Sequence, residues 1–400
     1  MAAARSAVVV GAGVGGLAVA GGLVRTGWRV TLLERAERLR GEPTAQLLWP
    51  GGIRALHALG LGPGLSEIST PVPDRGLRRP DGRWLVQPPS GLDRSGLPAG
   101  PGEAGEPVLA HAEDLHDALF AGLGDRVEIR TGVAVQRLAA ADRPGVTDGR
   151  ITWPADLVVG ADGVDSVLRS AVAPRSTVVS AGATAWRAVI PWYRAPRLPA
   201  DLATDGHTYR PGYQFFSASL GDRRAAGASR RGGRYWRAII TGAPRPEPPG
   251  TQLSLLRRWF DGWHPPIGEL LAATEPDDLV QQELRVVRPA LGRYAVPVGP
   301  GALVLIGDAG HALPEHLGQG ACLALEDAAT LVAAVRDAEP GPGLHAAAGR
   351  YEAARRPRVA EALRRSRQLA GTGPLARRPP VQARRREQAA AVATAWQPPP

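Results

Sequence analysis

A glycine cluster near the N-terminus has the spacing of a nucleotide-binding turn. It lies between a run expected to form a buried strand, Ala7–Val10, and a run expected to form a helix, Leu17–Thr26. Gly11 permits the tight turn, Gly13 lets a pyrophosphate approach the backbone at the helix N-terminus, and Gly16 lets helix and strand pack closely. We therefore predict a site for an adenine dinucleotide, contributed by the run Gly11-Ala12-Gly13-Val14-Gly15-Gly16.

The next expected strand, Arg29–Leu33, ends at an acidic residue, Glu34, which follows Gly16 by 18 residues. A carboxylate at this position can bind ribose hydroxyls, and it would repel a 2′-phosphate. The turn therefore favours FAD or NAD over NADP, with Glu34 and the adjoining Arg35 as further cofactor-binding candidates.

Two later glycine–acid motifs also follow apolar runs. Gly160-Ala161-Asp162-Gly163, taken alone, is an ordinary turn, whereas Gly307-Asp308 follows the expected strand Ala302–Ile306 and leads to an expected helix, Gly318–Arg336. A carboxylate at a strand end, followed by a glycine-rich helix start, offers an acceptor for ribitol hydroxyls and backbone donors for an anionic ring edge. These motifs add the cofactor-binding candidates Asp162, Asp308, Gly318, Gly320 and Ala321.

The last motif also carries a carboxylate next to an imidazole, at Glu315 and His316. Two interpretations are open. The pair could lie in a solvent-facing polar loop, or it could act in acid–base chemistry, with His316 titrating in the working pH range. The second interpretation makes His316 and Glu315 the candidate catalytic residues.

The stretch from residue 176 to 284 contains five of the ten tryptophans and reads as an antiparallel sheet with one covered face. Alternation along a strand puts Trp186 and Arg187 on opposite faces, so only one of them can line a pocket. Arg187 could anchor an anionic or phenolate substrate, or it could be a solvated residue of the sheet. The other substrate candidates, each also compatible with the sheet core, are Tyr209, Tyr213, Phe215 and Trp236.

Composition excludes several classes of protein. The chain has 400 residues, of which 44% are hydrophobic and 22% charged, which is enough for a folded core and for two or three domains. A single cysteine, Cys322, excludes an internal disulfide framework and a cysteine-rich metal site, and we expect no metal. The net charge of +10 comes from arginine alone, because the chain has no lysine. Since no segment combines an arginine stripe with exposed aromatic residues, we expect no nucleic-acid partner.

No apolar run is long enough to span a membrane, because six glycines interrupt the stretch Ala7–Val24. The N-terminus also lacks the cleavage pattern of a signal peptide. These features predict a cytoplasmic protein, with monomer and homodimer both open.

The three motifs, in this order and spacing, resemble those of the single-component FAD-dependent aromatic hydroxylases, the p-hydroxybenzoate hydroxylase-like flavoprotein monooxygenases. The resemblance covers residues 6–370. It implies that Gly11, Gly13, Gly16 and Glu34 hold the ADP half of FAD, that Asp308 holds the ribitol, and that the Gly318–Gly320 helix start lies beside the isoalloxazine. In this family the stretch at Asp162 is associated with both FAD and NAD(P)H.

The same resemblance implies the reaction. NADH or NADPH binds transiently and reduces FAD, O₂ forms a flavin C4a-hydroperoxide, and one oxygen atom enters an aromatic or polycyclic substrate, as expected of natural-product biosynthesis. Hydroxylation and epoxidation are both open. Two other classes stay open as well: an FAD-retaining cyclase or rearrangement enzyme without net redox chemistry, and an arginine-rich binding protein that has kept the fold.

The fold expected from the resemblance is α/β, with a Rossmann-like FAD-binding domain and an interleaved mixed or antiparallel substrate sheet. The FAD-binding domain would take residues 1–70, 101–175 and 285–370, the substrate domain residues 71–100 and 176–284, and a tail rich in Arg, Ala and Pro residues 371–400. The chain departs from the family at three positions, with Ala112 where arginine is usual, Glu315 where proline is common and Cys322 where asparagine is usual.

Overall fold

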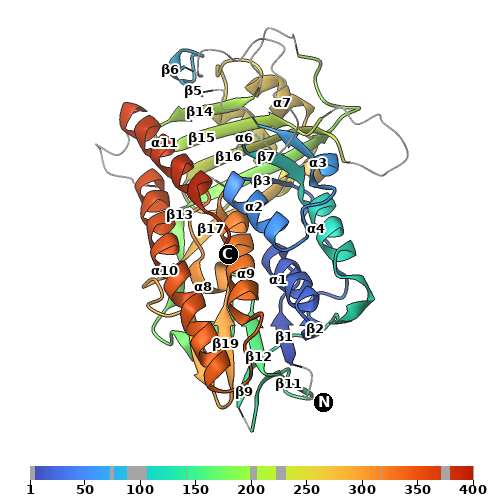
Figure 1. Cartoon of the computed structure of the whole chain (residues 1–400). Coiled ribbons are helices and arrows are strands. Elements are labelled where there is room, and N and C mark those ends of the chain that lie inside the picture. The colour runs from blue at the N-terminus through green and yellow to red at the C-terminus, as the bar shows by residue number, and fades with distance from the viewer. Residues whose placement is uncertain are drawn as a thin grey trace.

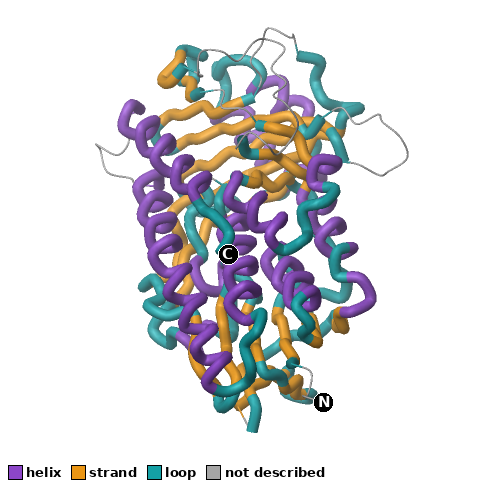
Figure 2. Tube along the Cα trace, viewed as in Figure 1, coloured by secondary structure: helices purple, strands orange, loops and turns teal. Residues whose placement is uncertain are grey.

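The computed structural model describes residues 5–72, 76–87, 106–140, 142–198, 205–221, 231–316, 318–370 and 379–399. Two large sheets lie one beyond the other along the molecule, and most of the helices lie around the lower one in the view of Figure 1. Figure 2 shows the same division, with helices packed along the lower half and strands crossing the upper half. No helix among the described residues is both long and apolar enough to cross a membrane.

The lower sheet has six strands in the order β18-β19-β12-β1-β2-β8. Its strands are β1 Ser6–Val10, β2 Arg29–Leu33, β8 Val127–Arg130, β12 Leu157–Gly160, β18 Ala295–Val298 and β19 Gly301–Leu305. All neighbours run parallel except β18, which pairs with β19 in the antiparallel sense. The central strands are continuous apolar runs that are buried along their length, as parallel strands covered on both faces require.

Helices pack around this sheet, and small sheets flank it. The helices of this part are α1 Val14–Arg25, α2 Pro50–Ala58, α3 Leu65–Ile68, α4 Ala112–Ala121, η1 Gly124–Arg126, α5 Arg169–Val172, α8 Asp308–His311, α9 Gly320–Val335 and α10 Pro342–Ala370. One small sheet joins β3 Ala45–Leu48, β7 Val108–His111 and β4 Ser69–Pro71, and the other joins β11 Thr152–Pro154, β10 Pro144–Thr147 and β9 Arg137–Ala140.

The upper sheet has seven strands in the order β17-β13-β16-β15-β14-β5-β6. Its strands are β5 Leu77–Arg78, β6 Trp84–Val86, β13 Thr177–Pro191, β14 Gly206–Arg210, β15 Tyr213–Ser219, β16 Gly233–Thr241 and β17 Val280–Arg288. One face carries a core of aromatic and aliphatic side chains that packs against α6 Pro249–Trp259 and α7 Ile267–Ala273, with η2 Pro276–Asp278 following. The other face, which includes Phe216 and Tyr235, joins the core of the lower sheet.

The C-terminal helix α11, Pro379–Ala395, joins the two parts of the molecule. It lies beside α10 and also contacts α2 and β6 (Figure 1). Arg358 donates from NH1 to the carbonyl oxygen of Val392 at 2.6 Å, and Arg54 donates to that of Trp396. The described part of the expected tail therefore packs on the domains, while residues 371–378 lie outside the described residues. Residues 88–100 of the expected substrate domain and 101–105 of the expected FAD-binding domain also lie outside them.

Candidate active site

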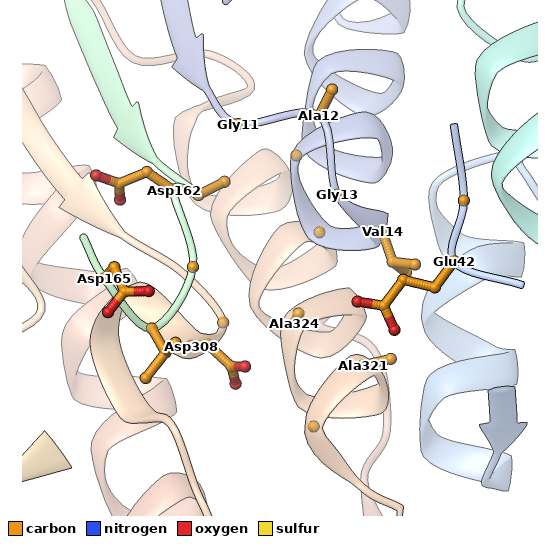
Figure 3. Close-up of a pocket in the computed structure, with 18 of the residues that line it drawn as sticks. Gly11, Ala12, Gly13, Val14, Glu42, Asp162, Asp165, Asp308, Ala321 and Ala324 are labelled. Atoms are coloured by element: carbon orange, nitrogen blue, oxygen red, sulfur yellow. The ribbon is translucent and has the colours of Figure 1, made fainter. Parts of the chain in front are cut away.

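A cavity of about 810 Å³ opens where β1, β12 and β19 end, between the N-termini of α1 and α9. Figure 3 shows the Gly11–Val14 turn on one side and the first turns of α9, at Ala321 and Ala324, on another. The cavity is lined by all twelve cofactor-binding candidates, namely Gly11, Gly13, Val14, Gly15, Gly16, Glu34, Arg35, Asp162, Asp308, Gly318, Gly320 and Ala321. Motifs that lie far apart in the sequence thus meet at one site.

The glycine turn has the backbone geometry that its spacing predicts. Gly11 has a φ of +103°, and a Cβ atom on Gly16 would lie 1.9 Å from the carbonyl oxygen of Gly11. A Cβ atom on Gly13, in contrast, would meet nothing within 4 Å. Gly11 and Gly16 therefore serve the close packing of β1 and α1, whereas Gly13 leaves room on the cavity side.

The two long helices that begin at the cavity both point an uncompensated positive end towards it. Neither α1 nor α9 has a side-chain cap, and neither has an acidic residue in its first turn. Free N–H groups and the helix dipole make such ends favourable for anions. The cavity can therefore hold a ligand with negative charge at two separate places.

Glu34 is fixed by the backbone around it. Its Oε2 accepts a hydrogen bond from the Ala12 N–H at 2.8 Å, and its Oε1 accepts one from the Ala36 N–H at 2.9 Å. Each carboxylate oxygen retains further acceptor capacity, and Glu34 lines the cavity. The residue thus ties the glycine turn to the end of β2 and still offers acceptors for ribose hydroxyls.

Asp162 and Asp308 have different surroundings. Asp162 Oδ2 accepts from the Val167 N–H at 2.9 Å, and burial raises the pKa of this carboxyl group. In Figure 3 its carboxylate points away from the α1 turn, so this side chain mainly shapes the loop that follows β12. The Asp308 side chain is exposed to the cavity. Desolvation by the surrounding protein raises the pKa of its carboxyl group as well.

Two further residues of the site were missed by the sequence reasoning. His116 of α4 is buried, lines the cavity, and has Nε2 at 3.1 Å from the carbonyl oxygen of Ala12. Arg40 lines the cavity near Ala112 and pairs with Glu113 through Nε at 2.9 Å. A helical pattern predicts α4 but does not show which of its turns meets the glycine loop, so no signal in the sequence identified His116.

The upper sheet closes the far end of the cavity with a charged cluster. Arg187 and Glu315 line the cavity, and they form an ion pair. Glu315 also pairs with Arg237 of β16, whose NH1 lies 3.1 Å from Oε1. Glu315 is therefore half-buried in an ion-pair cluster with two buried arginines, and His316 is buried. The interpretation of residues 315 and 316 as a solvent-facing loop is wrong.

The structure separates the two members of the expected acid–base pair. His316 is buried on the other side of the loop, in a small chamber with His207, Tyr209 and Arg386, and it does not line the main cavity. Burial lowers the pKa of His316 to about 3, and the nearby Arg237 and Arg386 add to the effect. The ring is therefore neutral in the working pH range, contrary to the expected titration.

The aromatic substrate candidates do not meet at the cavity either. Phe215 and Trp236 belong to the core under α6 and α7, with Tyr213 packed against it, on the face opposite to Arg187. Tyr209 lies in a separate cluster with Leu77 and Ala383. Of the five proposed substrate residues, only Arg187 lines the main cavity among the described residues.

Comparison with known proteins gives the family. Residues 264–366 match the family model of an FAD binding domain, and residues 6–48 match that of the pyridine nucleotide-disulphide oxidoreductases. The chain is 35% identical over 368 residues to 3-amino-4-hydroxybenzoate 2-monooxygenase of Streptomyces cremeus, covering 90% of this chain and 86% of that protein. The chain belongs to the FAD-dependent aromatic monooxygenases.

Other members of this monooxygenase family agree with the fold and the motifs. The 2-heptyl-3-hydroxy-4(1H)-quinolone synthase of Pseudomonas aeruginosa is 33% identical, with coverage of 80% of this chain and 78% of that protein. The structure of Klebsiella pneumoniae HpxO with FAD and uric acid superimposes with a TM-score of 0.73 at 24% identity, covering 98% of this chain and 93% of that one. The expected α/β fold of the p-hydroxybenzoate hydroxylase type is confirmed.

The cofactor of this monooxygenase is FAD, and the residues at the cavity fit it. The open Cα face of Gly13 at the α1 N-terminus suits a close approach by a pyrophosphate. Glu34 suits the adenosine ribose, Asp308 suits a ribityl chain, and the uncapped start of α9 suits an anionic ring edge. The cavity therefore contains donors and acceptors suited to each of these parts of FAD.

Proposed function

We propose that this chain uses NADH or NADPH and O₂ to insert one oxygen atom, by hydroxylation or epoxidation, into an aromatic or polycyclic substrate. The observation that carries the proposal is the continuity of the cavity. It runs from the Gly11–Gly16 turn past Asp308 to Arg187 and Glu315 of the upper sheet. A cofactor bound along it would reach the polar face of that sheet, where a substrate ring can meet it.

The substrate class is supported by the relatives and by the inner face of the sheet. The names of two relatives contain an aminohydroxybenzoate and a quinolone, both planar aromatic compounds. On this face of the sheet, Arg187 and Gln282 line the cavity. A few polar groups at the end of a cavity can fix the orientation of a planar ring.

The residues of this chain bind the cofactor, orient it and shield the reacting atoms from water. The α1 and α9 N-termini stabilise negative charge on the cofactor, and Glu34 and Asp308 fix its hydroxyl groups. FAD, when bound and reduced, supplies the activation of O₂. The upper sheet covers the far end of the cavity, and this cover limits the access of water to the reacting atoms. Among the described residues, no second Gly-x-Gly-x-x-Gly turn follows a strand, and we propose that the nicotinamide coenzyme binds only transiently.

The direct test is isotopic. The FAD-loaded enzyme is incubated with NADH or NADPH, ¹⁸O₂ and a panel of planar phenols, quinolones and hydroxybenzoates, while coenzyme oxidation and H₂O₂ release are recorded. We expect one ¹⁸O atom in the product for each coenzyme oxidised, with little H₂O₂. Coenzyme oxidation that yields only H₂O₂ with every compound contradicts the assigned substrate class. A product that forms without ¹⁸O overturns the proposal in favour of cyclisation or rearrangement.

A further inference from the structure

His116 of α4 forms a hydrogen bond to the glycine turn from outside the turn. Its side chain is buried, with 6% of its surface exposed, and the ring lines the cavity. The Nε2 atom lies 3.1 Å from the carbonyl oxygen of Ala12, which is 104 residues away in the chain. Because a carbonyl oxygen can only accept, Nε2 carries the proton and donates it to this bond.

The backbone of Ala12 is held by a side chain on each side. Its N–H donates to Glu34 Oε2 at 2.8 Å, and its carbonyl oxygen accepts from His116. Ala12 is itself only 4% exposed, and a buried carbonyl group without a partner costs free energy. The turn therefore depends on two long-range hydrogen bonds, and only the one from Glu34 belongs to the glycine motif.

The bond to His116 also sets the direction of the next N–H group. In a planar trans peptide the carbonyl of one residue and the N–H of the next point in opposite directions. Since the Ala12 carbonyl points to His116, the Gly13 N–H points away from it. In the described part of the chain this N–H donates to no other group, and a Cβ atom on Gly13 would meet nothing within 4 Å. The donor is therefore available to a ligand at the glycine turn.

Glycine at position 13 makes the orientation of this peptide plane easy to change. A reversal of the plane alters ψ of Ala12 and φ of Gly13, which is now −71°, and glycine tolerates both signs of φ. A reversed plane would present the Ala12 carbonyl oxygen, in place of the Gly13 N–H, to an anion at the turn. A fixed N–H group favours such an anion, whereas a carbonyl oxygen repels it. The hydrogen bond from His116 opposes this reversal.

We propose that His116 is a positioning residue for FAD, which holds the Ala12–Gly13 peptide with its N–H edge towards the pyrophosphate. Glu34 fixes the preceding peptide, and His116 fixes this one. The role concerns the binding of the cofactor and is independent of the proposed oxygen insertion.

The experiment measures the dissociation constant of FAD for the apoproteins by fluorescence titration. His116→Leu fills the space of the ring but cannot donate, and we expect it to weaken FAD binding about five- to tenfold, as the loss of one hydrogen bond predicts. His116→Gln keeps an amide N–H donor at the end of the side chain and should bind FAD within about twofold of the wild type.

Leu119→Ala is the matched control within α4. Leu119 is buried and does not line the cavity, so its truncation should lower the thermal stability of the apoprotein through lost packing. FAD binding by the folded variant should stay within about twofold of the wild type. An FAD loss in Leu119→Ala as large as that in His116→Leu would assign the effect to a general loosening of α4 and overturn the proposal.

The double variant Gly13→Ala/His116→Leu tests whether the effect passes through the pyrophosphate. A methyl group on Gly13 takes space where the pyrophosphate approaches, so His116→Leu should cost less FAD affinity in this background than in the wild type. Additive losses would contradict a shared action on the pyrophosphate. Unchanged FAD affinity in His116→Leu, or an equal loss in His116→Gln, would also overturn the proposal.

Discussion

Asp327 Oδ2 accepts a hydrogen bond from the Gly307 N–H at 2.8 Å and lies 2.6 Å from His311 Nε2. A side chain of α9 thus holds both ends of the short turn that presents Asp308 to the cavity. Asp327 Oδ1 in turn lies 2.6 Å from Arg355 Nε, and Arg355 also pairs with Glu326. The position of Asp308 therefore depends on a charge network that is fully buried between α9 and α10.

Replacement of Asp327 by asparagine should be strongly destabilising. It leaves Arg355 buried with one fewer carboxylate, and removal of one partner of a buried pair costs about 3–5 kcal/mol. We expect a drop of that size in the free energy of unfolding by urea, together with weaker FAD binding. Glu128→Gln, which breaks an exposed pair with Arg130, should change stability by less than about 1 kcal/mol. Similar losses in the two variants would contradict the assigned role of the network.

The contribution of Asp327 to the stability of the protein depends on pH in a defined direction. Burial alone would raise the pKa of Asp327, but His311 and Arg355 lower it to about 2 from an ordinary value of 3.8. Its contribution is therefore complete above about pH 4 and is lost as the pH falls towards 2. Urea unfolding at several pH values should show the difference between wild type and Asp327→Asn shrinking in this range. A difference in the free energy of unfolding that stays constant down to pH 2 would contradict the lowered pKa of Asp327.

The two glycines Gly13 and Gly16 should respond differently to alanine. A Cβ atom at Gly16 would meet the Gly11 carbonyl, so Gly16→Ala should destabilise the apoprotein by about 1–3 kcal/mol or more. Gly13→Ala should leave apoprotein stability near the wild-type value, because its Cβ atom meets nothing within 4 Å. It should still weaken FAD binding, by at least about tenfold, since the methyl group takes space where the pyrophosphate approaches.

Thermal unfolding of the apoproteins and fluorescence titration with FAD separate the two effects. Equal losses of apoprotein stability in Gly13→Ala and Gly16→Ala would contradict the division of roles. Unchanged FAD affinity in Gly13→Ala would contradict the placement of the pyrophosphate.

Cys322 should be chemically silent in the folded enzyme. Burial raises the pKa of its thiol to about 12, and Sγ accepts a hydrogen bond from the Trp49 N–H at 3.2 Å. Thiolate is the reactive form, so a thiol reagent at pH 8 should label the native protein slowly and the unfolded protein fully. Because the chain has one cysteine, the number of labelled thiols per protein molecule reports the reactivity of Cys322 alone. Rapid labelling of the native enzyme would overturn the assignment of Cys322 as a small apolar core residue.

The glycine motifs were predictable because the chemistry and the spacing are encoded within short segments. Gly11, Glu34 and Asp308 each follow a strand of one parallel sheet, and the carboxyl ends of parallel strands meet at one edge. The helix α9 begins two residues later than the sequence predicts, since Gly318 has a φ of +66° and belongs to the turn before the helix. A glycine-rich run alone does not show where helical hydrogen bonding begins.

The residues of the upper sheet that line the cavity could not be predicted in the same way. Alternation along β13 and β16 shows that Trp236 and Arg237 lie on opposite faces, but it does not show which face meets the cofactor domain. The bulky aromatic residues instead fill the core under α6 and α7, while Arg187 lines the cavity and Arg237 is buried on the same face of the sheet. Glu315 and His316 likewise separate, because the Glu315 side chain lines the cavity and the adjacent His316 side chain lies in the small chamber.

The buried His316 should make the protein sensitive to acid. Its pKa is lowered from an ordinary value of 6.5 to about 3, first by burial and then by Arg237 and Arg386. Between these values the unfolded chain binds a proton that the native protein does not, so stability falls as the pH falls from about 6.5 to 3. His316→Gln should reduce this loss, because glutamine does not titrate.

The measurement is urea unfolding of wild type and variant from pH 7.5 to 3.5. The Asp327→Asn variant is the control, because its effect on stability changes only below about pH 4. If the stability of His316→Gln falls as steeply as that of the wild type between pH 6.5 and 4, the ring is protonated in the native state and the buried neutral histidine is disproved.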